Sequence, residues 1–445
     1  MKKYIIIPGN TDLNRGDQAL VWETINIFKE LEKDSEYYVL ESGNTTEEIL
    51  LQSRQTWKRG IKTCSPVLLH PGRDNNSNSV NYSKYDMLFW GWRAIKDFLI
   101  TVLLLTKVEK INNLGKLFIN KRQSETFNLF KEADGVILKG GGIFHFYGKI
   151  TELYLSYYFL YHIMLAKRFN KKVYILPNSF GPFNNTLVNG MLKTYLSKAD
   201  FISSRENISY ECLKDILKIK SLLFPDLGFF VKASTRDFTQ YLQDKGVPIN
   251  NKKLVCITLR PYRFPKSKNP SEKYQNYVSE IVKTVEFLLK KEYHVIFMAH
   301  TLGPSAHEDD RIAISDVLKN IQDNNIMKNI TYIEDADLNC KDLVKIYSYM
   351  NLIIGTRFHS VIFALNSNIP AIAISYGGNK GMGIMKDIGI ENLNISIEEI
   401  EANKLKNKID YIENNYLLIQ EKIIEYREKI QQEREELKNK LRRII

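Results

Sequence analysis

Short apolar runs alternate with amphipathic stretches along most of this chain, which is the pattern of an α/β protein built from strand–helix units. The runs predict two series of strands. The first series comprises residues 4–7, 37–40, 135–138, 173–176, 200–203 and 222–224, and the second comprises residues 254–259, 294–298, 330–333, 352–354 and 371–374. Two successive series predict two Rossmann-like domains that face each other across a cleft.

The polar stretch 231–251 separates the two series and holds the expected interdomain linker. At 445 residues the chain is too long for one ordinary core, so two domains are expected. We place the N-terminal domain at residues 1–234 and the second domain at 235–396. From residue 397 onward, charges of both signs alternate with a broken apolar stripe, which predicts a C-terminal helical segment, 397–445.

Cationic and aromatic side chains gather in residues 351–390. Arg357 and His359 follow one predicted strand at the start of a helix, and Tyr376 and Lys380 follow the next strand. Ligands bind beyond the carboxyl ends of parallel strands, where helix N-termini attract anions. Each residue also has a structural interpretation, in which Arg357 pairs with a carboxylate and His359 caps the helix. For the whole set we favour an anion site.

Two motifs of the first series also follow strand ends. Asn14, Gly16 and Asp17 lie where a loop meets a helix; Asp17 caps that helix or the loop orients a substrate. Gly141 and Gly142 belong to a glycine run, which allows a ligand or another backbone to approach closely. The run lacks the spacing of a dinucleotide fingerprint or a P-loop.

Other polar residues beside predicted strands are candidates for the cleft. His145 is expected at a helix start, as an acid or base or as a partner of a backbone carbonyl. Arg205 follows the strand 200–203, and its structural interpretation is a salt bridge to Glu206 or a neighbour. His300 lies just past the strand 294–298 and is expected in the cleft. We interpret Asp226 as structural, and the acidic residues 308–310 as a helix N-terminal cluster.

The net charge of +12 and the pI near 9.1 indicate an anionic partner. Nucleic acid is not favoured, because no basic and aromatic motif for binding it is present. The four cysteines stand far apart without a metal-binding spacing, which predicts neither disulfides nor a zinc or other metal site. The N-terminal apolar run is too short for a signal peptide, so we expect a cytoplasmic protein.

Two segments of the first half are unusual. Residues 52–86 are polar and predict a long loop over the cleft. The next stretch, 90–110, combines Trp90 and Trp92 with an apolar run and flanking lysines, but the run is shorter than the roughly 20 residues of a membrane span. Residues 90–110 form either a helix buried in the first domain, which we favour, or a helix at a membrane surface, which would make the protein peripheral to the membrane.

The motifs together resemble the polysaccharide pyruvyl transferase family. Arg357-Phe358-His359, an apolar helix, a strand and a Tyr-x-x-x-Lys loop follow the family pattern, with Phe358 where the family usually has Leu. The glycine run, the Asn-x-Gly-Asp motif and Arg205 with its acidic neighbour occur in the same order over most of residues 1–395. The resemblance implies a glycosyltransferase-B-like fold. In that fold C-terminal helices pack across the domain junction, although beyond about residue 420 a coiled coil or an exposed arm is equally open.

The family's activity implies a function for this chain. Such enzymes move pyruvate from phosphoenolpyruvate onto two hydroxyls of a sugar, forming a cyclic ketal and releasing phosphate, with no cofactor besides this donor. The acceptor would be a surface or capsular polysaccharide precursor, lipid-linked or free, on the side of the first domain. Arg205, Arg357 and Lys380 would bind the donor anion. His145 and His359 would supply the acid and the base, in an order that the sequence leaves open.

Two other functions stay open from the sequence. One is a glycosyltransferase of the same fold that uses a sugar nucleotide, although no acidic residue is convincingly placed for a ribose. The other is a non-catalytic membrane-surface assembly protein of a glycan pathway. The presence of Arg357, His359 and Arg205 argues against this second alternative.

Overall fold

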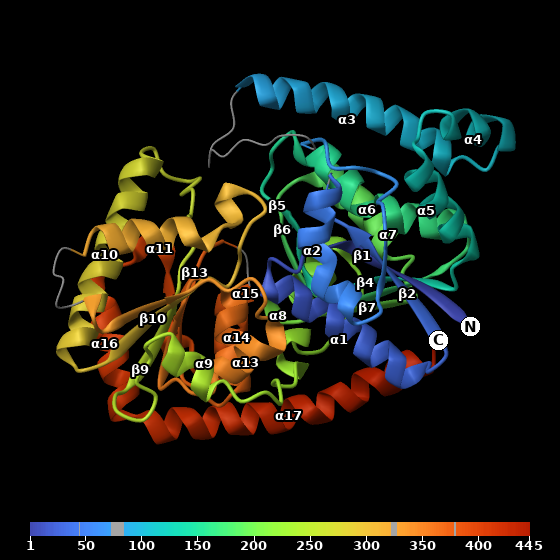
Figure 1. Cartoon of the computed structure of the whole chain (residues 1–445). Coiled ribbons are helices and arrows are strands. Elements are labelled where there is room, and N and C mark those ends of the chain that lie inside the picture. The colour runs from blue at the N-terminus through green and yellow to red at the C-terminus, as the bar shows by residue number, and fades with distance from the viewer. Residues whose placement is uncertain (44, 73–83, 322–326, 378–379) are drawn as a thin grey trace.

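A computed structural model describes residues 1–43, 45–72, 84–321, 327–377 and 380–445, and two parallel sheets organise it (Figure 1). The expected boundary at residue 234 falls between the last strand of one sheet and the first strand of the other. The expected boundary at residue 396 coincides with the end of the last strand. The remaining residues form two helices, so the chain has the expected α/β architecture with a helical C-terminus.

The first sheet has the strand order β3-β2-β1-β4-β6-β7-β8, with β5 paired to β6. Its strands are β1 (Lys2–Asn10), β2 (Ser35–Glu41), β3 (Lys62–Cys64), β4 (Gly135–Leu138), β5 (Gly141–Phe146), β6 (Lys172–Phe183), β7 (Phe201–Ser204) and β8 (Leu222–Leu223). Its helices are α1 (Arg15–Leu31), α2 (Thr46–Lys58), α3 (Lys84–Leu105), α4 (Glu109–Lys116), α5 (Lys121–Glu132), α6 (Glu152–Arg168), α7 (Thr186–Leu196) and α8 (Asn207–Cys212).

The second sheet has the order β11-β10-β9-β12-β13-β14, in which the chain starts at the centre and winds outward in both directions. Its strands are β9 (Leu254–Thr258), β10 (His294–Met298), β11 (Ile330–Ile333), β12 (Leu352–Gly355), β13 (Ala371–Ser375) and β14 (Asn394–Ser396). Its helices are α9 (Thr239–Asp244), α10 (Pro270–Lys290), α11 (Asp310–Lys319), α13 (Cys340–Tyr347), α14 (Phe358–Asn366) and α15 (Lys380–Asp387).

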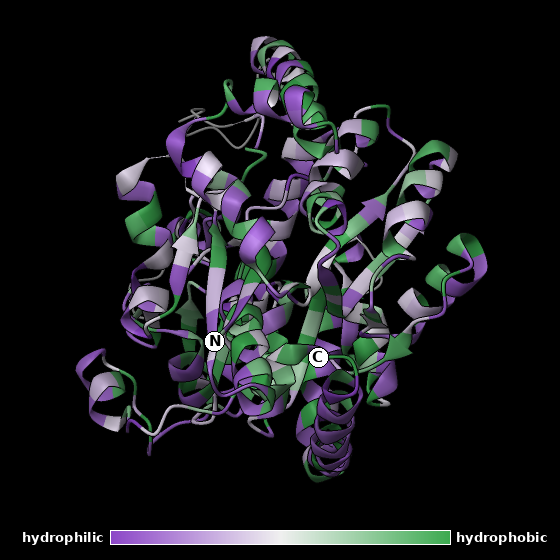
Figure 2. Cartoon of the chain, turned by 90° about the vertical axis from the view of Figure 1, so that its right-hand side faces the viewer, coloured by the Kyte–Doolittle hydropathy of each residue, from purple (hydrophilic) through white to green (hydrophobic). Residues whose placement is uncertain are grey.

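The apolar runs form strands because both faces of each sheet are covered. All residues of β4, β9, β10 and β12 are buried. Strands buried on both faces read as continuous apolar runs rather than as alternating patterns. Figure 2 shows the mostly hydrophobic strands in the interior, with the hydrophilic colouring concentrated on the outer helices.

Some local predictions were wrong. The segment after the glycine run is not a helix start but β5, which places His145 on a strand. Residues 52–86 are not one loop, because α2 extends to Lys58 and β3 follows it; the part of the expected loop at 73–83 lies outside the described residues.

The two domains share one hydrophobic core, which runs from β1 and α1 through β9 to β14. Polar contacts also cross the junction. Arg15 is 1% exposed, and its guanidinium donates from Nε to the carbonyl of Leu338 at 3.0 Å and from Nη2 to the carbonyl of Asp335 at 3.1 Å. The start of α1 is therefore fixed against the second domain, which determines how the carboxyl ends of the two sheets face each other.

The C-terminal segment forms α16 (Ala402–Asn414) and α17 (Tyr416–Arg442). Figure 1 shows α17 extending beneath both domains. Leu437 and Leu441 are fully buried, and Arg434 and Lys438 pair with Glu30 of α1. The packing of C-terminal helices across the junction is thus observed, and the alternatives of a coiled coil or an exposed arm are wrong.

The helix predicted around Trp90 and Trp92 is α3, and it lies on the surface of the first domain (Figure 1). Leu104 is buried, but most of the large apolar side chains of α3 are exposed. The favoured interpretation, a helix buried in the first domain, is therefore wrong.

Candidate functional site

A cavity of about 190 Å³ opens between the carboxyl ends of the two sheets. The first domain contributes residues from the start of α1, from β5 and from the turn after β7, and the second contributes residues that follow β10, β12 and β13. The lining consists of Asn14, Asp17, Leu20, Gly141, Gly142, Arg205, His300, Arg357, Phe358, His359 and Tyr376. The structure thus brings most of the residues expected in the cleft around one space.

Arg357 is 5% exposed and occupies the centre of an ion-pair network. Its Nε donates to Oδ1 of Asp310 at 2.7 Å, and its Nη1 donates to Oε2 of Glu308 at 2.6 Å. Arg260 donates to the other oxygen of Glu308 at 2.5 Å. Among the described residues, Nη2 of Arg357 has no hydrogen-bond partner. The carboxylate pairing considered from sequence is therefore present, and it leaves one donor nitrogen of the fork available.

Burial and charge act in opposite directions in this network. Burial would raise the pKa of Glu308, but the charges of Arg357 and Arg260 outweigh it and lower that pKa to about 2. Burial raises the pKa of Asp310, and the Arg357 guanidinium opposes that rise. Burial alone would lower the pKa of Arg357, yet the two carboxylates raise it well above its ordinary value. Arg357 is therefore a permanent cation at the cavity wall.

Arg205 and His359 approach the same carboxylate from different domains. Nη1 of Arg205 donates to Oδ2 of Asp226 at 2.7 Å, and Nε2 of His359 lies 3.7 Å from Oδ1 of Asp226. Nε of Arg205 donates to the Ser179 hydroxyl at 2.7 Å, and Glu206 lies farther away at 3.5 Å. Asp226 is fully buried. A buried carboxylate at this distance places negative charge beside the imidazole of His359.

Two glycines allow these side chains to approach the backbone. A Cβ at Gly16 would stand 2.2 Å from Nδ1 of His359, and a Cβ at Gly142 would stand 3.0 Å from Nη2 of Arg205. The glycine run therefore accommodates a guanidinium, and Gly16 lets His359 rest against the first turn of α1.

The start of α1 differs from its prediction. Asn14, not Asp17, caps the helix, because its side chain accepts from the N–H groups of Gly16 and Asp17. Asp17 instead accepts from Nζ of Lys139 at 3.1 Å, and the same ammonium donates to the carbonyl of Gly9 at 3.1 Å. Asp17 therefore faces the cavity with a buried lysine as its partner.

His300 and Tyr376 complete the wall on the side of the second domain. Nδ1 of His300 lies 3.2 Å from the Tyr347 hydroxyl, and its ring packs on Phe363 of α14. The guanidinium of Arg260 lies 4.5 Å from the ring centre of Tyr376. These aromatic contacts fix the positions of a histidine and a tyrosine beside Arg357.

Two expected site residues are not among the lining residues. His145 is exposed on β5, where its ring meets Tyr147 edge-on with 6.0 Å between the centroids. Lys380 is the first residue of α15, and its side chain lies outside the described part of the chain.

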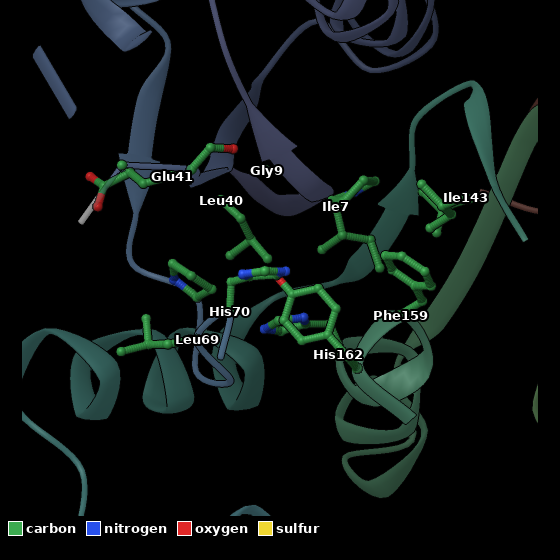
Figure 3. Close-up of a pocket in the computed structure, with 15 residues that line it drawn as sticks. Ile7, Gly9, Leu40, Glu41, Leu69, His70, Ile143, Phe159 and His162 are labelled. Atoms are coloured by element: carbon green, nitrogen blue, oxygen red, sulfur yellow. The ribbon is translucent and has the colours of Figure 1, made fainter. Parts of the chain in front are cut away.

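A second cavity, of about 240 Å³, lies in the first domain at the carboxyl ends of β1, β2 and β4. In Figure 3, His70 and His162 point into it, and Ile7 and Leu40 form the opposite wall. The ring of Tyr158 meets His70 edge-on at 5.5 Å. β5 separates the two cavities, since Gly141 and Gly142 line the first and Ile143 lines the second.

Sequence reasoning missed the acidic partners of the site. Asp226 was interpreted as structural, and it does accept from the N–H of Gly228, but it also holds Arg205 and faces His359. Of the acidic residues 308–310, only Asp309 is the N-cap of α11, while Glu308 and Asp310 bind Arg357. Asp226 lies two residues after a predicted strand. A position just past a strand end is the feature that indicated Arg357 and His359, and it could have indicated Asp226 as well.

A family model described as Polysaccharide pyruvyl transferase matches residues 14–378. The Amylovoran biosynthesis protein AmsJ of Erwinia amylovora is 24% identical over 333 residues, which cover 74% of this chain and 77% of AmsJ. The match to the family model includes every residue that lines the cavity between the domains.

Solved structures show the same fold at low identity. S. aureus MnaA with UDP has a TM-score of 0.54 at 12% identity, covering 94% of this chain and 90% of MnaA. The E. coli trehalose-6-phosphate structure bound with UDP-2-fluoro glucose has a TM-score of 0.55 at 13% identity, covering 100% of both chains. Sucrose-phosphate synthase from Thermosynechococcus elongatus has a TM-score of 0.54 at 10% identity, covering 100% of this chain and 99% of the synthase. The expected glycosyltransferase-B-like fold is confirmed.

Proposed function

This chain belongs to the polysaccharide pyruvyl transferase family, and we propose that it moves pyruvate from phosphoenolpyruvate onto a sugar of a surface or capsular polysaccharide precursor. The family match and the AmsJ relative identify a polysaccharide-modifying transferase. The donor, the ketal product and the residue roles are the proposal. The observation that carries it is that Arg205, Arg357 and His359 line one interdomain cavity, with the buried Asp226 beside Arg205 and His359.

A donor with a carboxylate and a phosphate needs cations in excess of the local carboxylates. Burial first, and then the charges of Arg263, Arg260 and Arg357, lower the pKa of His307 to about 4, while Glu308 opposes them. Three arginines therefore act on this histidine against one carboxylate. The partnerless Nη2 of Arg357 is the donor group assigned to the substrate anion. Lys380 remains a further proposed anion ligand.

The start of α14 offers a second feature for an anion. Its N-cap is Arg357, and among the described residues no side chain caps the helix by a hydrogen bond. The helix dipole therefore places positive potential at the cavity wall formed by Phe358 and His359. We assign the phosphate of the donor to this end of the cavity.

Forming the ketal requires two new C–O bonds at C2 of the donor, the first by addition to the double bond and the second by substitution of the phosphate. Protonation of the donor methylene carbon accompanies attack by the first sugar hydroxyl, and the second hydroxyl then displaces phosphate. The two sugar hydroxyls lose two protons in total. One proton is matched by the proton that the donor methylene carbon gains, and the other leaves with the phosphate. We assign the proton transfers to His359, because it lines the cavity and Asp226 stabilises its charged form. His145 stays a candidate at the rim.

The acceptor sugar is assigned to the first domain, in the cavity of Figure 3. Its rings, His70, Tyr158 and Phe159, suit the apolar face of a sugar, and Glu41 and Ser42 supply hydroxyl-binding oxygens. This cavity lies across β5 from the donor cavity, so the two substrates would meet at the glycine run.

The test is a reaction of the full-length protein with phosphoenolpyruvate and a panel of free and lipid-linked glycans. Released phosphate and the mass of the glycan product are measured. We expect phosphate release that depends on the acceptor, with one ketal-linked pyruvate on the product. His359→Gln should lower kcat by about 10²-fold or more. His294→Gln, at the opposite end of the second sheet, is the matched control and should retain activity.

The glycosyltransferase alternative is tested in the same experiment by adding UDP-sugars, since solved neighbours of this fold contain UDP. Transfer from a UDP-sugar without phosphate release from phosphoenolpyruvate would contradict the proposed donor. Turnover of neither donor with any acceptor would contradict both enzymatic functions.

A further inference from the structure

α3 exposes an apolar stripe along its length on the outside of the first domain (Figure 1). Leu88 is 72% exposed, Trp92 60%, Ile95 64% and Leu99 60%. The exposed residues recur every three or four positions, so they form one face of the helix. Among the described side chains of α3, the large exposed apolar residues are Tyr85, Leu88, Phe89, Trp92, Ile95, Phe98, Leu99 and Val102.

A helix on a protein surface ordinarily turns its apolar face inward and its polar face toward solvent, and α3 shows the reverse distribution. Arg93 and Asp97 are less exposed than the neighbouring Trp92 and Ile95. On the inner side, the hydroxyl of Thr101 lies 2.8 Å from the hydroxyl of Tyr157 of α6. The helix therefore contacts the domain partly through polar groups and presents its larger apolar face outward.

The apolar surface continues beyond α3. Each large apolar residue from the N-cap of α4 to its last turn is more than two-fifths exposed, namely Val108, Ile111 and Leu114. Just after α4, Leu117 and Phe118 are exposed to a greater extent. α4 packs on the end of α3, where the amide of Asn112 donates to the carbonyl of Leu104 at 2.9 Å. The two helices together form one projecting unit, which we call the α3–α4 arm (residues 84–118).

Basic side chains accompany the exposed rings of the α3–α4 arm. The guanidinium of Arg93 lies 4.3 Å from the ring centre of Phe89, and the ammonium of Lys96 lies 5.7 Å from that of Trp92. Lys107 and Lys110 are exposed where α3 gives way to α4. Tryptophan and tyrosine beside lysine and arginine are the side chains that occupy the headgroup level of a membrane.

We propose that the α3–α4 arm docks this protein on an anionic lipid surface, with the axis of α3 in the plane of the membrane. The apolar stripe would enter the boundary between headgroups and acyl chains, while the flanking lysines bind lipid phosphates. No helix among the described residues is long and apolar enough to cross a membrane, so the contact is a peripheral one.

Charge complementarity favours a lipid surface over a second copy of this chain. A two-fold contact through this face would bring the same patch of each copy together, including Lys96, Lys107 and Lys110. Like charges would then oppose one another around an apolar centre, which weakens association. An anionic lipid surface pairs with those lysines and covers the stripe at the same time.

The test is flotation of the full-length protein with vesicles of phosphatidylcholine alone and with phosphatidylglycerol added. We expect the protein to float with the anionic vesicles, less with the neutral ones, and less at high salt. The triple variant Trp92→Ser, Ile95→Ser and Leu99→Ser should lower the partition coefficient by about tenfold or more. Its thermal melt should match that of the wild type, because the three residues are exposed.

A matched control changes three exposed leucines elsewhere, Leu51, Leu187 and Leu417, to serine, and should float like the wild type. A wild-type protein that does not float, or a triple variant that floats as well as the wild type, would overturn the proposal. Sedimentation velocity without lipid tests whether a second copy of this chain covers the same face instead. A wild-type dimer that does not float, and that the triple variant converts to a monomer, would assign the face to a second copy.

Discussion

His359 and Asp226 meet across the domain junction, with Nε2 of the imidazole 3.7 Å from Oδ1 of the carboxylate. His359 belongs to α14 of the second domain, whereas Asp226 follows the last strand of the first sheet. The same carboxylate binds Arg205 at 2.7 Å. The proposed acid–base histidine and the carboxylate that faces it thus come from opposite domains.

Replacement of the shared carboxylate should reduce turnover, and it should also destabilise the fold, because the buried Arg205 loses its ion-pair partner. Asp226→Asn keeps the shape and an oxygen for the N–H of Gly228, but it removes the charge that stabilises the His359 imidazolium. We expect kcat for phosphate release to fall by about 10²- to 10⁴-fold. Asp200→Asn makes the same change at an acidic residue of the first domain outside the site and should leave kcat unchanged. A near wild-type kcat for Asp226→Asn would refute the role of Asp226.

The close approach at Gly16 gives a second prediction. In Gly16→Ala the new Cβ would stand 2.2 Å from Nδ1 and 2.8 Å from Cβ of His359, so the histidine or the start of α1 must move. A shift of about 1 Å at a reacting group costs about 10²-fold in rate. Gly190→Ala, a helical position with open space around it, is the matched control and should be neutral. Equal kcat for the two variants would show that His359 tolerates displacement.

Arg357→Lys should weaken both donor use and the fold. A lysine cannot bind Asp310 and Glu308 with a planar fork, so one carboxylate is left poorly paired. We expect a loss of about 2 kcal/mol or more in the free energy of unfolding, together with weaker binding of phosphoenolpyruvate. Arg311→Lys alters a neighbouring pair with Asp309 whose arginine is 46% exposed, and it should cost about 0–1 kcal/mol. Chemical denaturation and calorimetry measure the two effects, and equal losses for both variants would contradict this account.

The Glu308 network should also give a pH dependence. The charges of Arg357 and Arg260 outweigh burial and lower the pKa of Glu308 to about 2, below the value near 4.3 of an unfolded chain. The contribution of the ionised Glu308 to the free energy of unfolding is therefore complete above about pH 4.3 and is lost as the pH falls toward 2. The difference in melting temperature between the wild type and Glu308→Gln should be largest near neutral pH and shrink in acid. A difference that stays constant over this range would show that Glu308 does not titrate in this way.

The packing of α17 predicts a contrast within one helix. Leu437 is fully buried under the first domain, so Leu437→Ala should cost about 2–5 kcal/mol in the free energy of unfolding. Leu417, near the start of the same helix, is 73% exposed, and Leu417→Ala should be nearly neutral. Denaturant titration of both variants checks this. Similar and small losses of unfolding free energy for both variants would mean that the end of α17 does not pack on the first domain in solution.

The sequence determined the strands and the edge at which the site forms. β4 and β10 begin and end at the residues predicted from the sequence, because strands covered on both faces read as nearly continuous apolar runs. Arg357 and His359 were located from the same pattern, since they follow a strand end, whereas Arg205 was selected through the family resemblance. The periodicity of a run and the identity of the residue after it are local properties of the sequence, so they can be read without knowing the fold.

Only the tertiary structure decided which charges meet and which apolar faces are covered. Arg357 and its partner Asp310 follow different strands of the second sheet, and Asp226 reaches His359 from the other domain. The apolar stripe of α3 resembles a core helix in sequence, yet it lies outside, while the mixed pattern of α17 conceals Leu437 and Leu441 in contact with the first domain. Amphipathicity shows that a face needs a partner, and the packing of the whole chain determines whether the protein itself provides one.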